Sequence, residues 1–314
     1  MNKVQQDNVN VNIAQKGALV NLQTGQWTAR KLDKEETKKV VADNSCSAEA
    51  ARVNKSLMPG DGLIKDIASN ISDFRQNVHY VMTMPWGDDG WRLIPAASIG
   101  EYRKLFRAAE DRHSDLVSQM VQDYHAKVAA AQAMFTCLGK LFKATDYPQS
   151  SQIASKYRFS CDWNSISDAD DLRVSISEEA AAEIRREMKA ANDAKLNGAV
   201  KDTYERVHGA VAKLVDRLGN DANGDAKIFR DSLLDNVKEL CEVLPGLNIT
   251  GDPLLAGIVD KLHGQIAGLE CDDLRVDARA GKAKREAQAV VVEENKAKVM
   301  KTAQDILADL AGAL

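Results

Sequence analysis

The sequence predicts a mainly α-helical protein that contains a long antiparallel coiled-coil helical hairpin. Three observations support this fold class. Aromatic residues make up only 5% of the 314 residues, and alanine is abundant, a composition that favours close packing of helices over sheets. Two long segments, 98–142 and 177–218, carry apolar residues at helical spacing. Between them, residues 156–176 contain two short runs with the alternation of β-strands.

These observations also divide the chain into parts. Residues 1–17 are polar and lack periodicity, so we expect a flexible tail. Residues 98–219 are expected to form the coiled-coil arm, with a small β-hairpin at its tip at 156–176. The remaining residues, 18–97 and 220–314, are expected to form a helical body with one N-terminal strand.

The N-terminal part of the body shows a strand pattern followed by helix patterns. Alternation over 18–30 predicts one strand, with Gly25 marking a possible bulge. Asp33 and Glu36 have the spacing of a helix-capping pair. Short helices are therefore expected at 33–43, 47–58 and 63–81, followed by a connection rich in Pro and Gly at 84–95.

Capping signals define the two arms. Ser98 and Glu101 form a capping box for the first arm, and Ser177 caps the second. The arms match in length, so an antiparallel pair would bury both apolar stripes. Strands are expected at 157–163 and 172–176.

The C-terminal part of the body reads as three further helices. A helix over 226–244 is expected to stop at Pro245, because proline disrupts helical hydrogen bonding. Asp252 and Pro253 then begin a helix that extends to residue 269. The last helix is expected at 278–311.

Composition argues against several classes of partner. The formal net charge is -4, so there is no overall basic field for nucleic acid or anionic lipid. Uncharged stretches such as 128–139 are too short to cross a membrane. The N-terminus lacks the apolar block of a signal peptide, which places the protein in the cytoplasm. Five cysteines without short spacing are expected to be reduced thiols, and they predict neither disulfides nor a zinc site.

The motifs that carry common chemistry are absent from the sequence. It contains neither GxxxxGK[ST] nor GxGxxG, the two glycine-rich phosphate cradles. It also lacks the HExxH zinc-protease pattern and the GxSxG nucleophile turn. We therefore predict no catalytic residues, no cofactor, no metal site and no enzymatic activity.

The predicted tip combines aromatic and acidic side chains. Acidic side chains repel nucleic acid and favour a basic protein surface. A solubilising turn explains them equally well. The candidate partner-binding residues are Tyr157, Phe159, Asp162, Trp163, Asp168, Asp170 and Asp171.

A basic cluster near the C-terminus is the candidate site for nucleic acid. Neighbouring glutamates at 286, 293 and 294 partly balance the positive charge of this cluster. A solvated helix face is therefore the favoured interpretation over a phosphate site. The residues of this cluster are Arg275, Arg279, Lys282, Lys284 and Arg285.

Several short blocks resemble an uncharacterised family of roughly 300-residue proteins from bacteriophages and their bacterial hosts. The resemblance covers most of the chain, although none of its blocks is catalytic, so it assigns no site residue. Members are often encoded near a MoxR-type AAA+ ATPase and a von Willebrand A-type protein, which implies an accessory role in a remodelling complex. The blocks are Leu19-Val-Asn-Leu, Trp27-Thr-Ala-Arg-Lys-Leu32, Met84-Pro-Trp to Ile94-Pro, Leu247-Asn-Ile-Thr-Gly-Asp-Pro253 and Asp273-Leu-Arg275.

These features favour a phage-related helical interaction or adaptor protein, accessory to a MoxR-type AAA+ ATPase, in the cytoplasm of the host if phage-encoded. One alternative is a nucleic-acid accessory protein that uses the basic cluster. Another is a virion component in which the arms pair between chains. The sequence leaves the oligomeric state open.

Overall fold

The computed structural model describes residues 13–47, 49–136, 142–168, 177–220, 227, 229–276 and 282–312. The structure is 69% helical and 11% strand, which confirms the mainly α-helical class. The chain forms two compact units, each assembled from segments that are distant in the sequence. The first unit contains Met1–Asn21, Tyr80–Gly100 and Trp163–Leu314, and the second contains Leu22–His79 and Glu101–Asp162.

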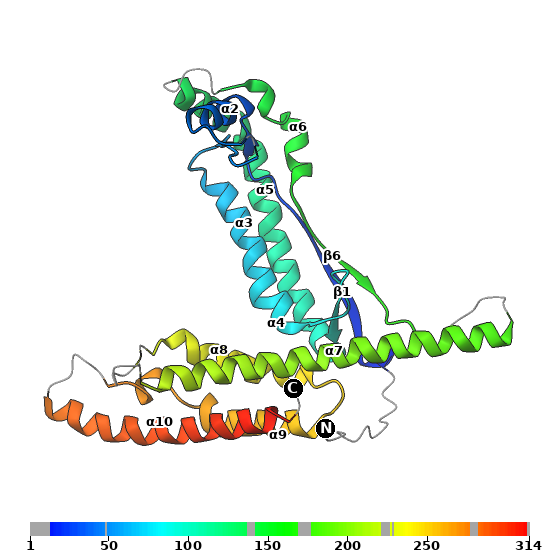
Figure 1. Ribbon diagram of the computed structural model, residues 1–314, viewed down its shortest axis with the longest axis vertical. Helices are drawn as coiled ribbons and strands as arrows, with labels where there is room; N and C mark the ends of the chain where they lie inside the picture. The colour runs from blue at the N-terminus through cyan, green and yellow to red at the C-terminus, as the bar shows by residue number, and fades with distance from the viewer. Residues whose placement is uncertain are drawn as a thin grey trace. The chain divides into compact units, whose positions relative to one another are not determined.

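The first unit is built mainly from four helices, α7 to α10, which pack against one another (Figure 1). Short elements from the N-terminal half of the chain complete it. Its long helices are α7 (Glu178–Leu218), α8 (Asp231–Leu247), α9 (Pro253–Leu262) and α10 (Lys282–Leu310). Its short elements are α1 (Ile13–Lys16), α4 (Tyr80–Met82), β4 (Met84–Pro85), β5 (Arg92–Pro95), the π-helical turn η6 (His263–Ala267), and the 3₁₀ turns η2 (Ala96–Ser98) and η7 (Cys271–Asp273).

Helical spacing of apolar residues explains the core of this unit. On α7 the buried side chains recur every three or four residues, as one face of a helix requires. The other three helices contribute matching faces, so each apolar stripe is covered by its neighbours. The core includes Val207, Val211 and Leu214 of α7, Val237, Cys241 and Leu244 of α8, Ile258 and Leu262 of α9, and Ala303, Ile306 and Leu310 of α10.

A small β-structure covers another part of α7. Strand β1 (Gly17–Gly25) begins in the first unit, where Gly17 to Val20 pair antiparallel with β5. Strands β4 and β5 form a hairpin, closed by a hydrogen bond from the amide of Trp86 to the carbonyl of Trp91 at 3.0 Å. Its buried residues pack on α7 and α8 in a cluster that includes Leu19, Met84, Trp86, Leu93, Ala199 and Leu247.

The second unit combines two long helices with strand residues. Helix α3 (Gly62–Phe74) continues into a π-helical turn, η1 (Arg75–His79), and α5 (Ile99–Thr136) crosses most of the unit. Figure 1 shows the second part of β1 and strand β6 (Arg158–Asn164) beside these helices. The smaller elements are β2 (Arg30–Leu32), α2 (Lys34–Asp43), β3 (Asn54–Ser56), η3 (Ala144–Asp146), α6 (Ser150–Ile153) and η4 (Ala154–Lys156).

An aromatic cluster holds α3, α5 and β6 together. The ring of Phe74 meets those of Tyr102, Phe106 and Phe159 edge to face, at centroid distances of 5.5 to 5.6 Å. Phe106 and Phe159 stack at 5.2 Å. Such geometries are the favourable ones for aromatic rings. The Asn70 side chain adds a hydrogen bond to the carbonyl oxygen of Ala109 at 2.9 Å.

The predicted hairpin of two long arms is not confirmed. Helices are present at both predicted positions, but from Val200 to Leu218 the apolar stripe of α7 packs against α8, α9 and α10 within the first unit. The described stripe of α5 is buried within the second unit, against α3 and β6. These parts of the two stripes are therefore already covered by other elements. The predicted arm, residues 98–219, is divided between the two units.

Of the predicted β-tip, the structure describes the first strand, which pairs with a strand outside the tip. Strand β6 is present at the first predicted strand, and it lies beside β1 in the sheet. The side chain of Arg158 donates to the amide oxygen of Gln23 on β1 at 2.5 Å. The second predicted strand, 172–176, lies outside the described residues. The hairpin over 156–176 therefore stays a prediction.

Four smaller expectations also change. Residues 13–17 belong to α1 and β1 rather than to a tail. The strand predicted over 18–30 is two strands, because β1 ends at Gly25 and β2 pairs with β3 in a separate sheet. In place of the helix predicted over 47–58, the structure has turns and β3. Helix α8 retains Pro245 and continues to Leu247, because a proline in the last turn disrupts only one helical hydrogen bond.

Asp252 joins α9 to α7. Its carboxylate caps α9 by accepting from the amides of Leu254 and Leu255 at 2.8 and 3.5 Å. The hydroxyl of Tyr204 on α7 donates to the same carboxylate at 2.5 Å. We predict that Asp252→Ala lowers the free energy of unfolding by about 2 kcal/mol, because the cap and a partly buried hydrogen bond are both lost.

Urea denaturation followed by circular dichroism measures this effect. Asp260→Ala is the matched control, because Asp260 is exposed on the same helix and its side chain has no partner among the described residues. Equal stability of the two variants would contradict the role of Asp252.

Candidate functional site

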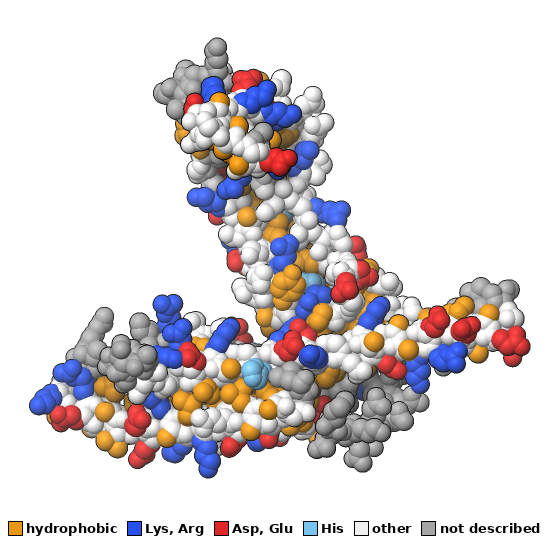
Figure 2. Space-filling view, viewed as in Figure 1, with side chains coloured by type: hydrophobic (Ala, Val, Ile, Leu, Met, Phe, Trp, Pro, Cys, Tyr) orange, Lys and Arg blue, Asp and Glu red, His pale blue; other side chains and the backbone are white. Residues whose placement is uncertain are grey.

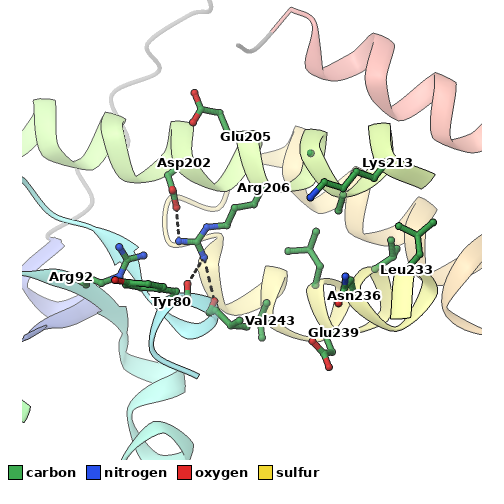
Figure 3. A pocket seen from close by; sticks show the side chains of 15 residues that line it. Tyr80, Arg92, Asp202, Glu205, Arg206, Lys213, Leu233, Asn236, Glu239 and Val243 are labelled. Atoms are coloured by element: carbon green, nitrogen blue, oxygen red, sulfur yellow. Dashed lines mark hydrogen bonds and ion pairs between the residues drawn. The ribbon is translucent and has the colours of Figure 1, made fainter. Parts of the chain in front are cut away.

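The first unit contains a groove of about 660 Å³ between α7 and α8. Figure 3 shows α7 along one side and α8 along the other, with Tyr80 and Arg92 at one end and Lys213 and Leu233 at the other. Every residue that lines the groove belongs to the first unit. On α7 these residues are Asp202, Glu205, Arg206, Gly209, Ala210 and Lys213, and on α8 they are Leu233, Asn236, Val237, Glu239, Leu240 and Val243.

Small residues on α7 open the groove. The lining residues of α7 recur at spacings of three and four, so they share one helix face beside the core face. At the middle of that face stand Gly209 and Ala210. A Cβ atom added at Gly209 would meet nothing within 4 Å. Because α7 lacks bulk here, the partly exposed apolar side chains of Leu233 and Leu240 on α8 remain reachable.

Arg206 closes one end of the groove. Its guanidinium donates to the carbonyl oxygens of Tyr80 and Thr83, both at 2.8 Å, and of Val81 at 3.3 Å. It also forms an ion pair with Asp202 at 2.6 Å, one helical turn away on α7. A cation is favourable at this position because the carbonyls at the end of a helix lack helical partners. Arg206 thus attaches the end of α4 to α7.

Arg92 forms a second cationic contact at the same end. It donates to the hydroxyl of Thr83 at 2.7 Å and to the carbonyl of Thr83 at 2.9 Å. Its guanidinium carbon also lies 4.9 Å from the centre of the Tyr80 ring, a cation–π geometry. The Tyr80 side chain remains 40% exposed. The two arginines are therefore engaged in holding the backbone of this end in place.

The remaining charges lie on the exposed rims. Glu205 makes only a long ion pair with Lys201, at 3.7 Å. Lys213 on α7 and Glu239 on α8 have no ion-pair partner among the described residues. In Figure 3 the carboxylates of Glu205 and Glu239 point outward on opposite sides of the groove. The groove combines a partly exposed apolar floor with unpaired charge along its edges.

This arrangement suits contact with an apolar surface. The polar groups at the closed end are occupied by internal partners, so they do not converge on a bound small molecule as binding-site groups do. Within the described part of the chain, no three His, Cys, Asp or Glu residues are grouped so as to hold a metal ion.

The sequence did not single out the groove. Two signals in the sequence could have indicated it: the i,i+4 spacing of Asp202 and Arg206, and the Gly209-Ala210 pair in a stripe of larger residues. Neither signal identifies the Tyr80–Thr83 carbonyls, which come from a distant part of the chain.

The predicted partner-binding residues differ in their exposure to solvent. Tyr157 and Phe159 are buried, at 8% and 7% exposure, and Phe159 is part of the aromatic cluster. These two side chains therefore offer little exposed surface, and their role in partner binding stays a prediction. Asp162 and Trp163 are exposed at the end of β6, and Asp168 is partly exposed. Asp170 and Asp171 lie outside the described residues.

The candidate nucleic-acid cluster is partly neutralised. Arg275 forms ion pairs with Asp231 at 2.7 Å and Asp272 at 3.1 Å. Lys282 and Arg285 are exposed at the start of α10. Arg279 and the side chain of Lys284 lie outside what the structure describes. Figure 2 shows acidic and basic side chains interspersed over α7 and α10 on the visible face, rather than a field of one sign.

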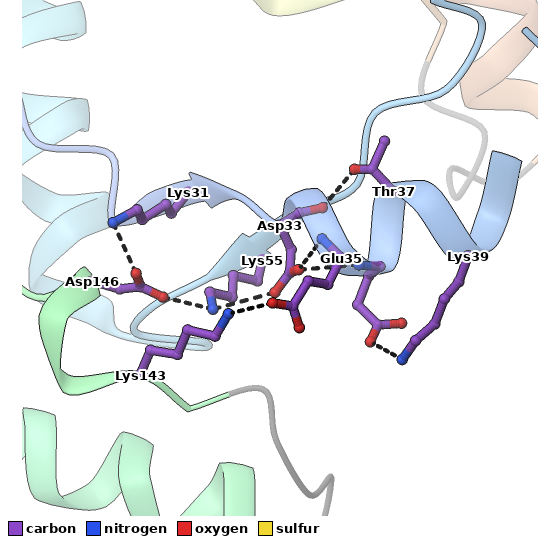
Figure 4. A network of polar contacts seen from close by, with 9 residues as sticks. Lys31, Asp33, Glu35, Thr37, Lys39, Lys55, Lys143 and Asp146 are labelled. Carbon is purple, nitrogen blue, oxygen red and sulfur yellow. Dashed lines mark hydrogen bonds and ion pairs between the residues drawn. The ribbon is translucent and has the colours of Figure 1, made fainter. Parts of the chain in front are cut away.

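A buried ion network lies in the second unit (Figure 4). The ammonium of Lys55 lies 2.6 Å from Asp146 and 3.3 Å from Asp33, and all three side chains are less than a tenth exposed. Lys31 adds a second contact to Asp146 at 2.8 Å. Asp33 also caps α2 by accepting from the amides of Glu35 and Glu36 at 3.1 Å. The network joins β2, β3, α2 and η3, and its charges are paired internally.

Both carboxylates of the network favour ionisation. The backbone amide of Glu36 lowers the pKa of Asp33, and Lys55 lowers it further against the effect of burial. Burial opposes ionisation of Asp146, but hydrogen bonds from Lys31 and Lys55 outweigh it and lower its pKa. Stability from these groups is therefore present above their ordinary pKa of 3.8 and is lost as the pH falls below it.

Burial also shifts the pKa of side chains elsewhere in the second unit, among them His113 and Cys161. His113 on α5 is 7% exposed, and neither of its ring nitrogens has a hydrogen-bond partner within the described chain. Burial lowers its pKa from the ordinary value of 6.5. Burial also raises the pKa of the Cys161 thiol to about 11. At neutral pH, Cys161 is accordingly a protonated thiol and a poor nucleophile.

Comparison with protein-family models gave no match. Comparisons with curated proteins and with solved structures likewise gave none. None of the described helices combines the length and apolar character needed to span a membrane.

We predict that Lys55→Met lowers the free energy of unfolding by about 3 kcal/mol, because it leaves two buried carboxylates with a single remaining cation. Chemical denaturation at pH 7 measures the loss. Lys38→Met is the control, because Lys38 is exposed on the neighbouring helix α2. A loss no larger than that of the control would show that the network contributes little.

We predict that His113→Phe becomes progressively more stabilising relative to the natural chain as the pH falls from 7.5 to 5. The folded pKa of His113 lies below 6.5, so the unfolded chain binds a proton first and the folded chain loses stability below that pH. Phenylalanine removes this proton uptake. Unfolding free energies across this range test the prediction, with the exposed His125→Phe as control; pH-independent differences would contradict it.

Proposed function

We propose that this protein is a helical interaction protein, without catalytic activity of its own, that binds a protein partner through the groove between α7 and α8. The observation that carries this proposal is that the polar groups of the groove are paired internally, whereas its apolar side chains are partly exposed. Arg206 and Asp202 are paired with each other and Arg206 also with backbone carbonyls, while the apolar side chains of Leu233 and Leu240 remain partly exposed. Burial of these apolar side chains against another apolar surface is the interaction that would contribute most to the free energy of binding here.

The proposed partner is a MoxR-type AAA+ ATPase. Support for this choice comes from the sequence resemblance, since members of that phage and bacterial family are often encoded beside such an ATPase. The protein would then act as an accessory factor in the cytoplasm, which is the cytoplasm of the host if a phage encodes it. The chain itself contains no glycine-rich nucleotide motif, so nucleotide hydrolysis would come from the partner.

The alternatives have less support. A nucleic-acid accessory role would rest on the start of α10, where Arg275 is already paired with Asp231 and Asp272. A virion role required the two arms to pair between chains, and much of each apolar stripe is already packed within its own unit. We therefore favour the protein-binding groove.

We predict that the natural chain co-elutes with a purified MoxR-type AAA+ ATPase, and that Ala210→Arg abolishes co-elution. A long charged side chain at Ala210 would occupy the middle of the groove and exclude an apolar partner. Size-exclusion chromatography of the mixed proteins, followed by gel analysis, measures the association.

Ala194→Arg is the matched control, because Ala194 is exposed on α7 away from the groove lining. It should co-elute as the natural chain does, and circular dichroism should show that both variants are folded. Co-elution of the Ala210 variant would place the binding site elsewhere. Failure of the natural chain to bind this ATPase or any other neighbouring gene product would count against an interaction role.

A further inference from the structure

We propose that the groove takes an amphipathic helix of about three turns from the partner. The helix would place an apolar face on the groove floor, basic side chains along its flanks and a carboxylate at the end nearest Lys213. This inference rests on the proposed function and adds the chemistry of the segment that is recognised. It follows from three properties of the groove: its length, its floor and its charges.

The length of the groove suits a short helix. Its lining residues on α7 run from Asp202 to Lys213, which corresponds to about 16 Å or three helical turns. The lining residues on α8 run alongside them from Val243 to Leu233 (Figure 3). Two parallel ridges of this length are the usual framework for binding an amphipathic helix.

The floor of the groove suits an apolar face that approaches closely. Gly209 and Ala210 form a low point on α7, and open space lies above Gly209. Opposite them, Leu240 of α8 provides partly exposed aliphatic surface, which Leu233 extends toward the far end. Residues at i, i+4 and i+7 of a docked helix would lie along this floor, since those positions share one face.

The charges on the rims of the groove determine which charged side chains the bound helix should carry along its sides. Glu205 and Glu239 lie on opposite rims, so a helix between them would place basic side chains toward both. The ion pair of Glu205 with Lys201 is long and exposed, and such pairs are weak and easily exchanged. Lys213 stands at the far end and favours a carboxylate there. Complementary charges of this kind fix the register and direction of a bound segment.

The groove is less suited to a small molecule or to a second copy of this chain. A small ligand needs polar groups that converge on it, whereas the inward polar groups here are held by internal contacts. A second copy could offer the exposed face of α10 around Val290 and Val291. That face carries Glu286 and Glu294, which would lie near the acidic rims.

Two stapled, fluorescein-labelled helical peptides of 15 residues test the inference with the full chain. Both carry leucines on one face. The first has lysines on its flanks and glutamates at one end, and the second has these charges inverted. Fluorescence anisotropy should show that the natural chain binds the first peptide about tenfold more tightly than the second, the size expected from a few exposed ion pairs turned from attractive to repulsive.

Charge reversal in the protein tests the register. The double variant Lys213→Glu, Glu239→Lys should abolish or reverse the preference between the two peptides. The matched control is Lys189→Glu, Glu242→Lys, which changes exposed residues of the same helices outside the groove lining and should retain the preference. Equal affinity for both peptides, no binding of either, or a preference unaffected by the groove variant would overturn the inference.

Failure of this inference is distinguishable from failure of the proposed function. If the ATPase binds the natural chain and not the Ala210→Arg variant, while neither peptide binds, the groove retains its role and the helical occupant is wrong. If the peptides bind with the expected preference and no neighbouring gene product binds, the groove chemistry stands and the proposed partner fails. Dimerisation of the chain that Ala210→Arg abolishes would identify a second copy as the occupant and overturn the inference.

Discussion

The arrangement of the candidate site depends on Arg206. One guanidinium satisfies the carbonyl oxygens of Tyr80, Val81 and Thr83 and neutralises Asp202. Without it, the end of α4 would lose its attachment to α7, and a carboxylate on the groove wall would lack its partner. Because arginine presents several donors in a fixed plane, it can serve a set of carbonyls and a carboxylate together. The position of the groove is therefore a consequence of backbone chemistry at a helix end.

Charges in this protein fall into two groups with different physical roles. Those with buried or partly buried heads, such as Lys55 and Arg206, are paired within their own unit. Burying a charge without a partner is costly, and internal pairing offsets that cost. Charges on the groove rims, such as Lys213 and Glu239, are exposed and without ion-pair partners among the described residues. Only the second group can influence what binds.

The helices themselves were predictable from local patterns. The capping roles of Asp33, Ser177 and Asp252 are confirmed, because a cap depends on residues within one turn. The packing of the helices was not predictable in the same way. Equal length suggested that the stripes of α5 and α7 would cover each other, yet any apolar face of suitable size can cover a stripe. Helices α8, α9 and α10 cover α7 instead.

The sequence by itself determined where most helices begin and end and which of their faces are apolar, because helical periodicity and capping are local. It could not determine that Phe159 is buried among Phe74 and Phe106, or that Arg206 contacts the carbonyl of Tyr80, since these residues are far apart in the chain. Only the tertiary structure decided which side chains remain exposed. The groove exists because Gly209 and Ala210 stand opposite the exposed edge of α8, a juxtaposition that arises from packing and has no local signal.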